Sequence, residues 1–294
     1  MNVERVTTFL AVAKHNGFRE AAKYTGLSQS SVTQHVRRLE ETLNVILIER
    51  NHAGSVLTPE GRVFLPYAEN LVKAHARACT VFDNNKLIVG ASSNTGIYLL
   101  PPYLKAFMDT LPHTVDVVIG NNPSMVEKLQ NFEIDVAIME WWDPQPGFSA
   151  ALWRREDLVL IVPPGHRWAG MPSITREFLH DQVLLGGEAG SGTGRLLGQY
   201  FGEYAKKIGT SLQLGSTEAV KHAVQAGLGI SLVMAACVVN EIRSGLLCAI
   251  PFEGKPLQKE LYVICREYAR KNAATGAFVH FMLSHNVDFR IPEH

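Results

Sequence analysis

Residues 29 to 38 contain a run of polar side chains that could bind a ligand through hydrogen bonds and positive charge. Amides and hydroxyls can hydrogen-bond to the edges of bases, and guanidinium groups can hold phosphates. No carboxylate interrupts the run before Glu40. Its members are Gln29, Ser30, Thr33, Gln34, Arg37 and Arg38. The run suits duplex DNA, and the alternative is the solvated face of a generic three-helix cluster.

An amphipathic helix must present these side chains. Its apolar positions, Val32, Val36, Leu39 and Leu43, fall four, three and four residues apart, which gives one buried stripe. Ser28 is a good N-cap for this helix. Upstream, the sequence predicts a helix over about 3–16, a shorter helix over about 18–24 and a tight turn at 25–27. This order is typical of a helix-turn-helix, in which the second helix of the pair enters the major groove.

Two short β-prone runs, 46–50 and 56–57, follow the third helix and flank a polar segment, 51–55. This pattern predicts a wing, from which Arg50 and His52 would hold phosphates together with Arg37. Gln29, Ser30, Thr33 and Gln34 would face base edges. Thr58-Pro59-Glu60 then restarts a helix, with a capping threonine, a proline at the first position and an acid in the first turn.

At this point the sequence resembles the LysR-type transcriptional regulators. The resemblance is ungapped over about 60 residues and rests on 9–13, 17–22, 27–33, 38–40 and 57–61. It implies a sequence-specific regulator that binds double-stranded promoter DNA, with RNA polymerase as a further candidate partner. Two departures matter: the family often has arginine where this chain has Gln34, and a second basic residue where it has Ala53-Gly54. With 11 Lys/Arg against 8 Asp/Glu in residues 1–90, we expect modest non-specific affinity and a shallow salt dependence.

The helical pattern continues from Pro59 to about Asn85. Its apolar positions alternate four and three apart and form a seam suited to helix pairing; they are Phe64, Ala68, Leu71, His75, Ala78 and Phe82. The alternative is a helix packed on its own domain. The resemblance implies self-association through this helix, to a dimer or a tetramer.

Strands and helices alternate after residue 85, which predicts a mainly parallel α/β sheet. Strands are expected at 86–91, 115–119, 135–139, 158–162, 183–185, 212–214, 230–233 and 261–265, and helices near 97–108, 124–132 and 273–284. The resemblance implies two α/β lobes like those of a periplasmic solute-binding protein, joined by crossover strands near 158–162 and 261–265. The expected domains are therefore a winged helix-turn-helix (1–58), a linker helix (59–86) and an effector-binding domain (87–294). Lobe I would comprise 87–161 and 266–294, and lobe II 162–265.

Polar segments that follow predicted strands would line a cleft between these lobes, because ligands bind at the carboxyl ends of strands in such sheets. The candidate effector-binding residues are Ser92, Ser93, Asn94, Thr95, Asn122, Gly192, Thr193 and Arg195. Hydroxyls at helix N-termini and a guanidinium favour an anion, so we expect a small anionic metabolite. For each segment alone, a plain strand-to-helix turn is the alternative.

Other classes of protein find little support in the sequence. There is no G-x-S-x-G around the candidate serines, no Walker lysine and no HExxH, so neither an enzyme nor a catalytic or other metal site is expected, and no cofactor. The four cysteines form no CxxC pair. No apolar run is long enough for a membrane span, and the N-terminus begins a helix pattern, so a cytoplasmic protein is expected. The net charge of zero by itself says nothing about nucleic acid.

Overall fold

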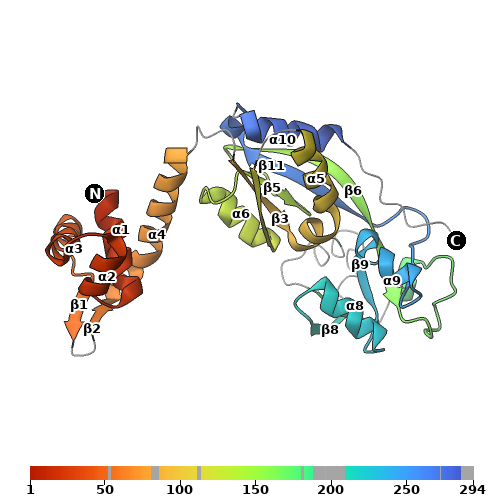
Figure 1. Cartoon of the computed structure of the whole chain (residues 1–294). Coiled ribbons are helices and arrows are strands. Elements are labelled where there is room, and N and C mark those ends of the chain that lie inside the picture. The colour runs from red at the N-terminus through yellow and green to blue at the C-terminus, as the bar shows by residue number, and fades with distance from the viewer. Residues whose placement is uncertain are drawn as a thin grey trace. The chain divides into compact units, whose positions relative to one another are not determined.

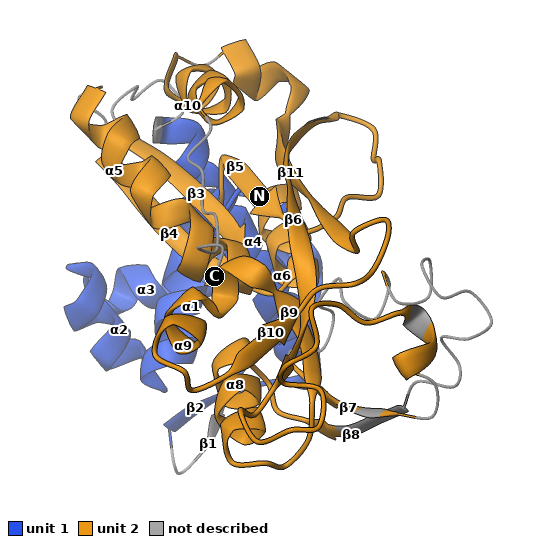
Figure 2. Cartoon of the chain, turned by 90° about the vertical axis from the view of Figure 1, so that its right-hand side faces the viewer, with its two compact units in different colours: residues 1–82, 131–133 blue, residues 83–130, 134–294 orange. Residues whose placement is uncertain are grey.

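The chain folds into two units, each with its own hydrophobic core (Figures 1 and 2). The structure is a computed structural model that describes residues 1–51, 54–80, 86–110, 114–179, 182–187, 196, 209–271 and 273–285. Residues 1–82 with 131–133 form the first unit, and residues 83–130 with 134–294 form the second.

The first unit is a helix-turn-helix followed by a two-stranded wing and a long helix. Its elements are α1 (Val3–His15), α2 (Phe18–Thr25), α3 (Gln29–Leu43), β1 (Ile48–Asn51), β2 (Gly54–Leu57) and α4 (Pro59–Thr80). Asn16 and Gly26 end α1 and α2 in the left-handed conformation, and the Ser28 side chain caps α3 by accepting from the Ser31 amide. The expected helix-turn-helix is therefore present, with Phe9 and Leu39 among the fully buried residues of its core.

The wing is anchored to the end of α3. One carboxylate oxygen of Glu40 accepts hydrogen bonds from the Leu47 amide (2.8 Å) and the Ile48 amide (3.1 Å), just before β1 begins. Helix α4 then packs close to the same segment, because a Cβ added at Gly61 would lie only 2.1 Å from the Leu47 carbonyl oxygen. These contacts give the wing a fixed start relative to α3.

Helix α4 uses the first half of its predicted seam differently from the expectation. Ala68 is fully buried, and Phe64 and Leu71 pack on the core of the first unit, so this half of the seam lies against its own domain. His75 and Ala78 are exposed, and Phe82 lies outside the described residues. The side of the helix that faces away from this core includes the exposed side chains of Val63 and Tyr67, which we call the outward stripe. The sequence pattern located the apolar seam but could not distinguish contact with the chain's own core from contact with another helix.

The second unit is built on a seven-stranded mixed sheet. Its strands are β3 (Lys86–Ser92), β4 (Thr114–Gly120), β5 (Val136–Met139), β6 (Phe148–Val162), β9 (Ser231–Met234), β10 (Cys248–Ile250) and β11 (Gln258–Arg266). Two further strands, β7 (Val183–Gly186) and β8 (Gly209–Gln213), pair in parallel beside it. The helices are α5 (Leu100–Thr110), α6 (Asn122–Gln130), α8 (Thr217–Gln225), α9 (Val239–Arg243) and α10 (Ala273–Ser284), with a π-helical turn, η1 (Thr95–Leu99), before α5.

Lobe I is a sheet covered on both faces. The strand order β11-β5-β3-β4 includes parallel pairs of β3 with both β4 and β5. Helices α5 and α10 cover one face, where Phe107 packs edge-on to Phe278, and α6 covers the other. A Cβ at Gly90 would lie 2.3 Å from a methyl group of Ile134, so the close packing against β3 requires glycine there. Burial between two helix layers explains why β5, whose four residues are all buried, is apolar throughout.

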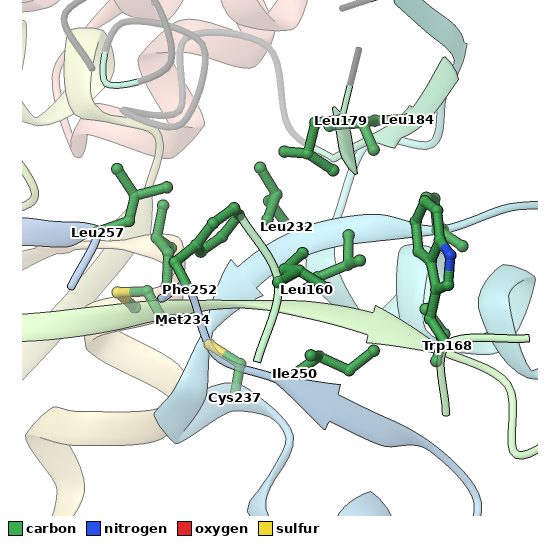
Figure 3. Packing of buried hydrophobic residues seen from close by; sticks show 14 of the residues in the cluster. Leu160, Trp168, Leu179, Leu184, Leu232, Met234, Cys237, Ile250, Phe252 and Leu257 are labelled. Atoms are coloured by element: carbon green, nitrogen blue, oxygen red, sulfur yellow. The ribbon is translucent and has the colours of Figure 1, made fainter. Parts of the chain in front are cut away.

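Lobe II forms around the second half of β6, which pairs antiparallel with β9 and β10. Alternate residues of β6 point to opposite faces. Leu160 lies in the cluster with Trp168 and Phe252 (Figure 3), and Ile161 faces α8. The 3-10 turn η4 (Ala235–Cys237) follows β9, and Cys237 lies at the edge of the cluster in Figure 3.

Two long strands connect the lobes. The predicted runs 158–162 and 261–265 are parts of β6 and β11, which pair antiparallel from Gln258↔Asp157 to Arg266↔Phe148. Residues 158–162 pair with β9 and β10 of lobe II, whereas residues 262–265 pair with β5 of lobe I. The strand exchange therefore falls near 157–158 and 258–261. The expected division at 161/162 and 265/266 assigned residues 158–161 to lobe I and 262–265 to lobe II, whereas the strand pairing places them in the opposite lobes.

Several elements differ from the sequence expectation in extent. Helix α6 begins two residues earlier than predicted, because the Asn121 carboxamide oxygen accepts from the Ser124 amide and caps it. Strand β6 begins at Phe148, well before the predicted 158. The prediction detected only its last third, because Arg154, Arg155 and Glu156 interrupt the apolar pattern on which it relied. Helix α8 and strand β10 were not predicted.

Candidate DNA-reading helix and interlobe site

Helix α3 carries a polar stripe opposite its buried face. Val32, Val36 and Leu39 are buried, and at helical spacing the positions farthest from them are 30, 34, 37 and 41. Ser30, Gln34 and Arg37 are exposed, as is Arg38 beside them. The predicted polar face therefore exists as one continuous surface on the helix that follows the turn.

Short hydrogen bonds order the first turns of this surface. The Ser28 and Ser30 hydroxyl oxygens lie 2.8 Å apart, and the Thr33 hydroxyl donates to the Gln29 carbonyl oxygen at 2.9 Å. Thr33 is thereby half-buried on the flank of the stripe, next to exposed Gln29. The exposed amides of Gln29 and Gln34 carry both donors and acceptors, which is what a base edge requires.

A carboxylate that the sequence reasoning did not consider ends the stripe. The Arg37 Nε lies 3.0 Å from a carboxylate oxygen of Glu41, one helical turn further on, and both side chains are more than half exposed. Glu41 therefore places a negative charge on the same face and competes with a phosphate for the guanidinium of Arg37. The spacing of four residues was the signal in the sequence that could have revealed this pair.

Four predicted site residues lie outside the described part of the chain. His52 comes from the predicted wing segment 51–55, and Gly192, Thr193 and Arg195 come from the predicted effector-binding segment of lobe II. Arg50 lies in β1, where only its backbone is described.

The predicted loop at residues 92–95 is not a loop. Ser92 ends strand β3, and a π-helical turn begins at Thr95. Both side chains are buried, and the Ser92 hydroxyl donates to the Thr95 hydroxyl at 2.8 Å. π-Helical turns are rare and occur often at functional sites. Ser93 and Asn94 are the half-buried residues of this segment, so they remain accessible.

Asn94 makes two hydrogen bonds that reach in opposite directions. Its amide nitrogen donates to a carboxylate oxygen of Glu140 at 3.2 Å, and its carboxamide oxygen accepts from the Thr217 hydroxyl at 2.7 Å. A carboxylate only accepts, so this geometry fixes the orientation of the carboxamide. Glu140 follows β5 of lobe I, whereas Thr217 begins α8 of lobe II.

Asn122 stabilises the segment after β5. It is buried, its amide nitrogen donates to the Trp141 carbonyl oxygen at 3.2 Å, and its carboxamide oxygen faces the Glu140 amide at 3.4 Å. Asn122 thus fixes the backbone that carries Glu140.

A buried ion pair lies behind Asn94. The Lys259 Nζ is 2.6 Å from a carboxylate oxygen of Glu140, and neither side chain is more than 3% exposed. Lys259 comes from β11, one of the two crossover strands. A pair of buried charges is retained only when each partner compensates the other, so these two residues must be considered together.

A second charged group occupies the first turns of α8. Lys221 is buried, and its Nζ lies 2.6 Å from Glu218, 2.8 Å from Glu241 and 3.1 Å from the Cys237 carbonyl oxygen. The carboxylate of Glu218 also accepts a hydrogen bond from the Tyr98 hydroxyl. The Lys221 Nζ also lies 5.1 Å from the centre of the Tyr98 ring.

The pKa directions agree with this geometry. Burial, followed by the hydrogen bond to Glu218, raises the pKa of Tyr98 well above its ordinary value. Burial alone would raise the pKa of Glu218, but the hydrogen bonds from Lys221 and Tyr98 outweigh it and lower that pKa. Burial disfavours a charged Lys221, yet the two carboxylates raise its pKa overall. Lys221 and Glu218 are therefore both charged at neutral pH, and the Tyr98 hydroxyl keeps its proton.

The candidate site residues chosen from the sequence include Asn94 but not the polar and charged residues around it, namely Glu140, Lys259, Tyr98, Thr217, Glu218 and Lys221. Charged residues are ordinarily on the surface, so a single sequence gives little reason to expect Glu140 and Lys259 to be buried. The position of Glu140 directly after a buried strand was the available signal.

Within the part of the chain that the structure describes, no helix is both long and apolar enough to cross a membrane.

Comparison with known proteins identifies both units. Residues 3–62 match the family model described as "Bacterial regulatory helix-turn-helix protein, lysR family", and residues 83–286 match "LysR substrate binding domain". The chain is 41% identical over 195 residues, 66% of its length and all of the relative, to an HTH-type transcriptional regulator protein named PtxE from Stutzerimonas stutzeri. It is 30% identical over 292 residues, 97% of its length and 96% of the relative, to the RuBisCO operon transcriptional regulator of Allochromatium vinosum.

Solved structures show the same fold. A full-length OxyR variant from Pseudomonas aeruginosa superposes with a TM-score of 0.66 at 20% identity, covering 96% of this chain and 94% of that one. Full-length CbnR in complex with its target DNA gives 0.58 at 22% identity, covering 96% and 98%. The regulatory domain of Synechocystis CcmR gives 0.61 at 24% identity, covering 68% and 96%.

The two units thus define a DNA-binding transcriptional regulator with a two-lobed effector-binding domain. The chain belongs to the LysR family of transcriptional regulators. The sequence-based expectation of this family, and of a regulator and not an enzyme, is confirmed by these matches.

Proposed function

We propose that this protein reads promoter DNA with the exposed stripe of α3 and that a small anionic metabolite between the two lobes controls it. The observation that carries the first part is the stripe itself, with Ser30, Gln34 and Arg37 aligned opposite the buried face. The first turns of a recognition helix are those that contact bases.

Residues of the first unit divide into two roles in this proposal. Gln29, Ser30, Thr33 and Gln34 contact base edges, and Arg37, Arg38, Arg50 and His52 hold phosphates. The relative CbnR was solved with its target DNA, which supports a DNA-bound state for this architecture. A chain that binds promoter DNA works in the cytoplasm, with RNA polymerase as a further partner.

Self-association would use the outward stripe of α4. Val63 and Tyr67 are each 69% exposed and lie on the side of the helix that faces away from its own core. Exposed apolar residues of this size at helical spacing are suited to pairing with a second copy. Such a dimer, or a tetramer of two dimers, presents paired recognition helices to an imperfect palindrome.

We place the effector between segment 92–95 of lobe I and segment 190–195 of lobe II, the second of which lies outside the described residues. Ser93 and Asn94 would contact it, Ser92, Thr95 and Asn122 would support them, and Gly192, Thr193 and Arg195 would complete the site. Lys221 and Lys259 already contact carboxylates, so we assign the counter-charge to Arg195. The regulatory domain of CcmR was solved in complex with 2-PG, which supports a small-molecule effector in this fold.

Arg37 gives a direct test of the DNA contact. Arg37→Ala should weaken binding about equally for all sequences and reduce the slope of log K against log salt by about 1 per subunit. Glu41→Gln should have the opposite effect, because it frees the guanidinium from the 3.0 Å contact. Fluorescence anisotropy with a target and a scrambled duplex at several salt concentrations measures both.

Two outcomes would contradict this assignment. The first is a loss for Arg37→Ala that is confined to one sequence. The second is a wild-type slope near −10 for the dimer, since such a slope requires more phosphate contacts than this weakly basic domain can supply.

The effector proposal is tested by thermal unfolding of the full-length chain with a set of small anionic, neutral and cationic metabolites. A true effector at a hundred times its Kd should add about 2.7 kcal/mol to the stability. Ser93→Ala and Thr193→Val should remove this gain while leaving DNA binding intact. Stabilisation by neutral or cationic compounds alone would refute the anionic class, and loss of basal DNA binding in these variants would refute the assigned site.

A further inference from the structure

Two side chains of lobe I meet the first turn of α8 in lobe II. Asn94 accepts from the Thr217 hydroxyl at 2.7 Å, and the Tyr98 hydroxyl donates to Glu218. Asn94 and Tyr98 are four residues apart in a helical segment, and Thr217 and Glu218 are adjacent. One helix face of lobe I therefore contacts one helical turn of lobe II through two polar contacts.

In each lobe, a charged residue orients one of the side chains that make these contacts. In lobe I, Glu140 accepts from the Asn94 amide at 3.2 Å and is itself fixed by Lys259 at 2.6 Å. In lobe II, Lys221 lies 2.6 Å from Glu218. The groups that meet across the lobes are thus pre-oriented, which reduces the entropy that forming the contacts costs.

An apolar side chain of the same turn also packs with residues of lobe II. Leu99, next to Tyr98 in the π-helical turn, is fully buried and belongs to the same cluster as Leu160 and Leu232 of lobe II. Leu160 and Leu232 are labelled in Figure 3. The turn is also adjacent to β3 and β5 of lobe I. The segment Asn94–Leu99 is therefore part of lobe I, because it follows strand β3, and its side chains contact residues of lobe II.

We propose that Asn94, Tyr98, Thr217 and Glu218 form an interlobe latch that holds the two lobes in the arrangement seen here, and that releasing it is the conformational step that sets the response of the protein. The second half of this statement rests on the proposed effector control, whereas the latch itself does not. A ligand shifts such an equilibrium only by binding one arrangement better than the other. An effector that contacts Asn94 competes directly with Thr217, so binding and release are coupled through one side chain.

Removing the latch bonds should change the population of separated lobes without unfolding either lobe. Thr217→Val removes one hydroxyl with little change of shape, and Tyr98→Phe removes the other. A hydrogen bond to a charged acceptor is stronger than one between neutral groups, so the double variant should raise the separated population about tenfold.

Matched controls exist within the same unit. The Tyr262 hydroxyl donates to Glu260 at 2.6 Å within one strand, and the Thr110 hydroxyl donates to the Phe107 carbonyl oxygen within α5. The variant Tyr262→Phe/Thr110→Val therefore removes the same chemical groups, one of them also bonded to a glutamate, without touching the contact between lobes.

Double electron–electron resonance between two spin labels on the full-length chain can detect the separation of the two lobes. Spin labels at Met108→Cys on α5 and Arg243→Cys on α9 report on the two lobes, in a background with Cys79→Ser and Cys248→Ala. Labelled chains are diluted with unlabelled ones so that each distance is measured within one chain. The latch variant should add a second distance population that both wild type and the control variant lack.

Identical distance distributions in the latch and control variants would overturn the proposal. Circular dichroism, measured on the same samples, shows whether the variant is folded, and Glu218→Gln provides a milder second variant with the same expected direction. Failure of the effector proposal would appear separately, as absence of ligand stabilisation in a wild type whose latch behaves as described.

Discussion

Replacing Lys259 with methionine should destabilise the second unit by about 3–5 kcal/mol, because it removes the ammonium group that lies against the buried Glu140 carboxylate. Both side chains are at most 3% exposed and their charged atoms are 2.6 Å apart, so solvent cannot take over the lost contact. The loss should shrink as the pH falls, since a protonated carboxyl costs less to bury than a carboxylate. Urea unfolding measured by tryptophan fluorescence is selective, because all four tryptophans (141, 142, 153 and 168) lie in this unit.

A surface pair provides the control for this prediction. Lys105 contacts Asp109 one turn away on α5, and both are more than half exposed, so Lys105→Met should cost no more than about 0.5 kcal/mol. The double variant Glu140→Leu/Lys259→Met should recover most of the stability, because apolar groups of similar volume can replace a buried pair. Equal, small effects of Lys259→Met and Lys105→Met would show that the buried pair does not stabilise the domain.

Changing Gln34 to alanine should alter which sequences the protein prefers, by about 1–3 kcal/mol at the base pair that it contacts. Gln34 is exposed in the middle of the α3 stripe, and a carboxamide can bond to a base edge with both a donor and an acceptor. Selection of binding sites from a random duplex library, followed by sequencing, measures the change. The corresponding loss of affinity for the wild-type target is about fivefold to 150-fold.

Two variants bracket this result. Arg37→Ala should weaken all sequences without changing the preferred site, and Thr42→Val provides a change on the same helix away from the stripe, because its hydroxyl donates only to the Arg38 carbonyl oxygen. An unchanged selected sequence for Gln34→Ala would remove Gln34 from the base-reading set. A selected sequence that changes for Arg37→Ala as well would show that the division between base and phosphate contacts is wrong.

The sequence was sufficient for the helix-turn-helix because its signals are local. Ser28 caps α3 through a bond that spans three residues, and Asn16 and Gly26 end the helices before it in the left-handed conformation. The buried stripe at Val32, Val36 and Leu39 follows from helical periodicity alone. Each of these features depends on residues within one or two turns, so no knowledge of distant contacts was needed.

The alternation of strands and helices likewise predicted a two-lobed α/β domain, but it did not place the exchange between the lobes. Strand β6 passes through both, and its polar middle around Arg154–Glu156 separates the two halves that periodicity can detect. Where the chain leaves one sheet and joins the other is decided by pairing with β5, β9 and β10, which come from distant parts of the sequence.

The polar stripe of α3, its capping residue and the family of the protein were determined by the sequence alone, since helix periodicity and local caps are encoded within short segments. The contacts between the two lobes, and the buried ion pair beside them, were decided by the tertiary structure. Asn94 and Thr217 are 123 positions apart, and Glu140 and Lys259 are 119 apart. A single sequence contains the residues of such pairs but not their proximity, because only the packing of the two lobes brings them within hydrogen-bonding distance.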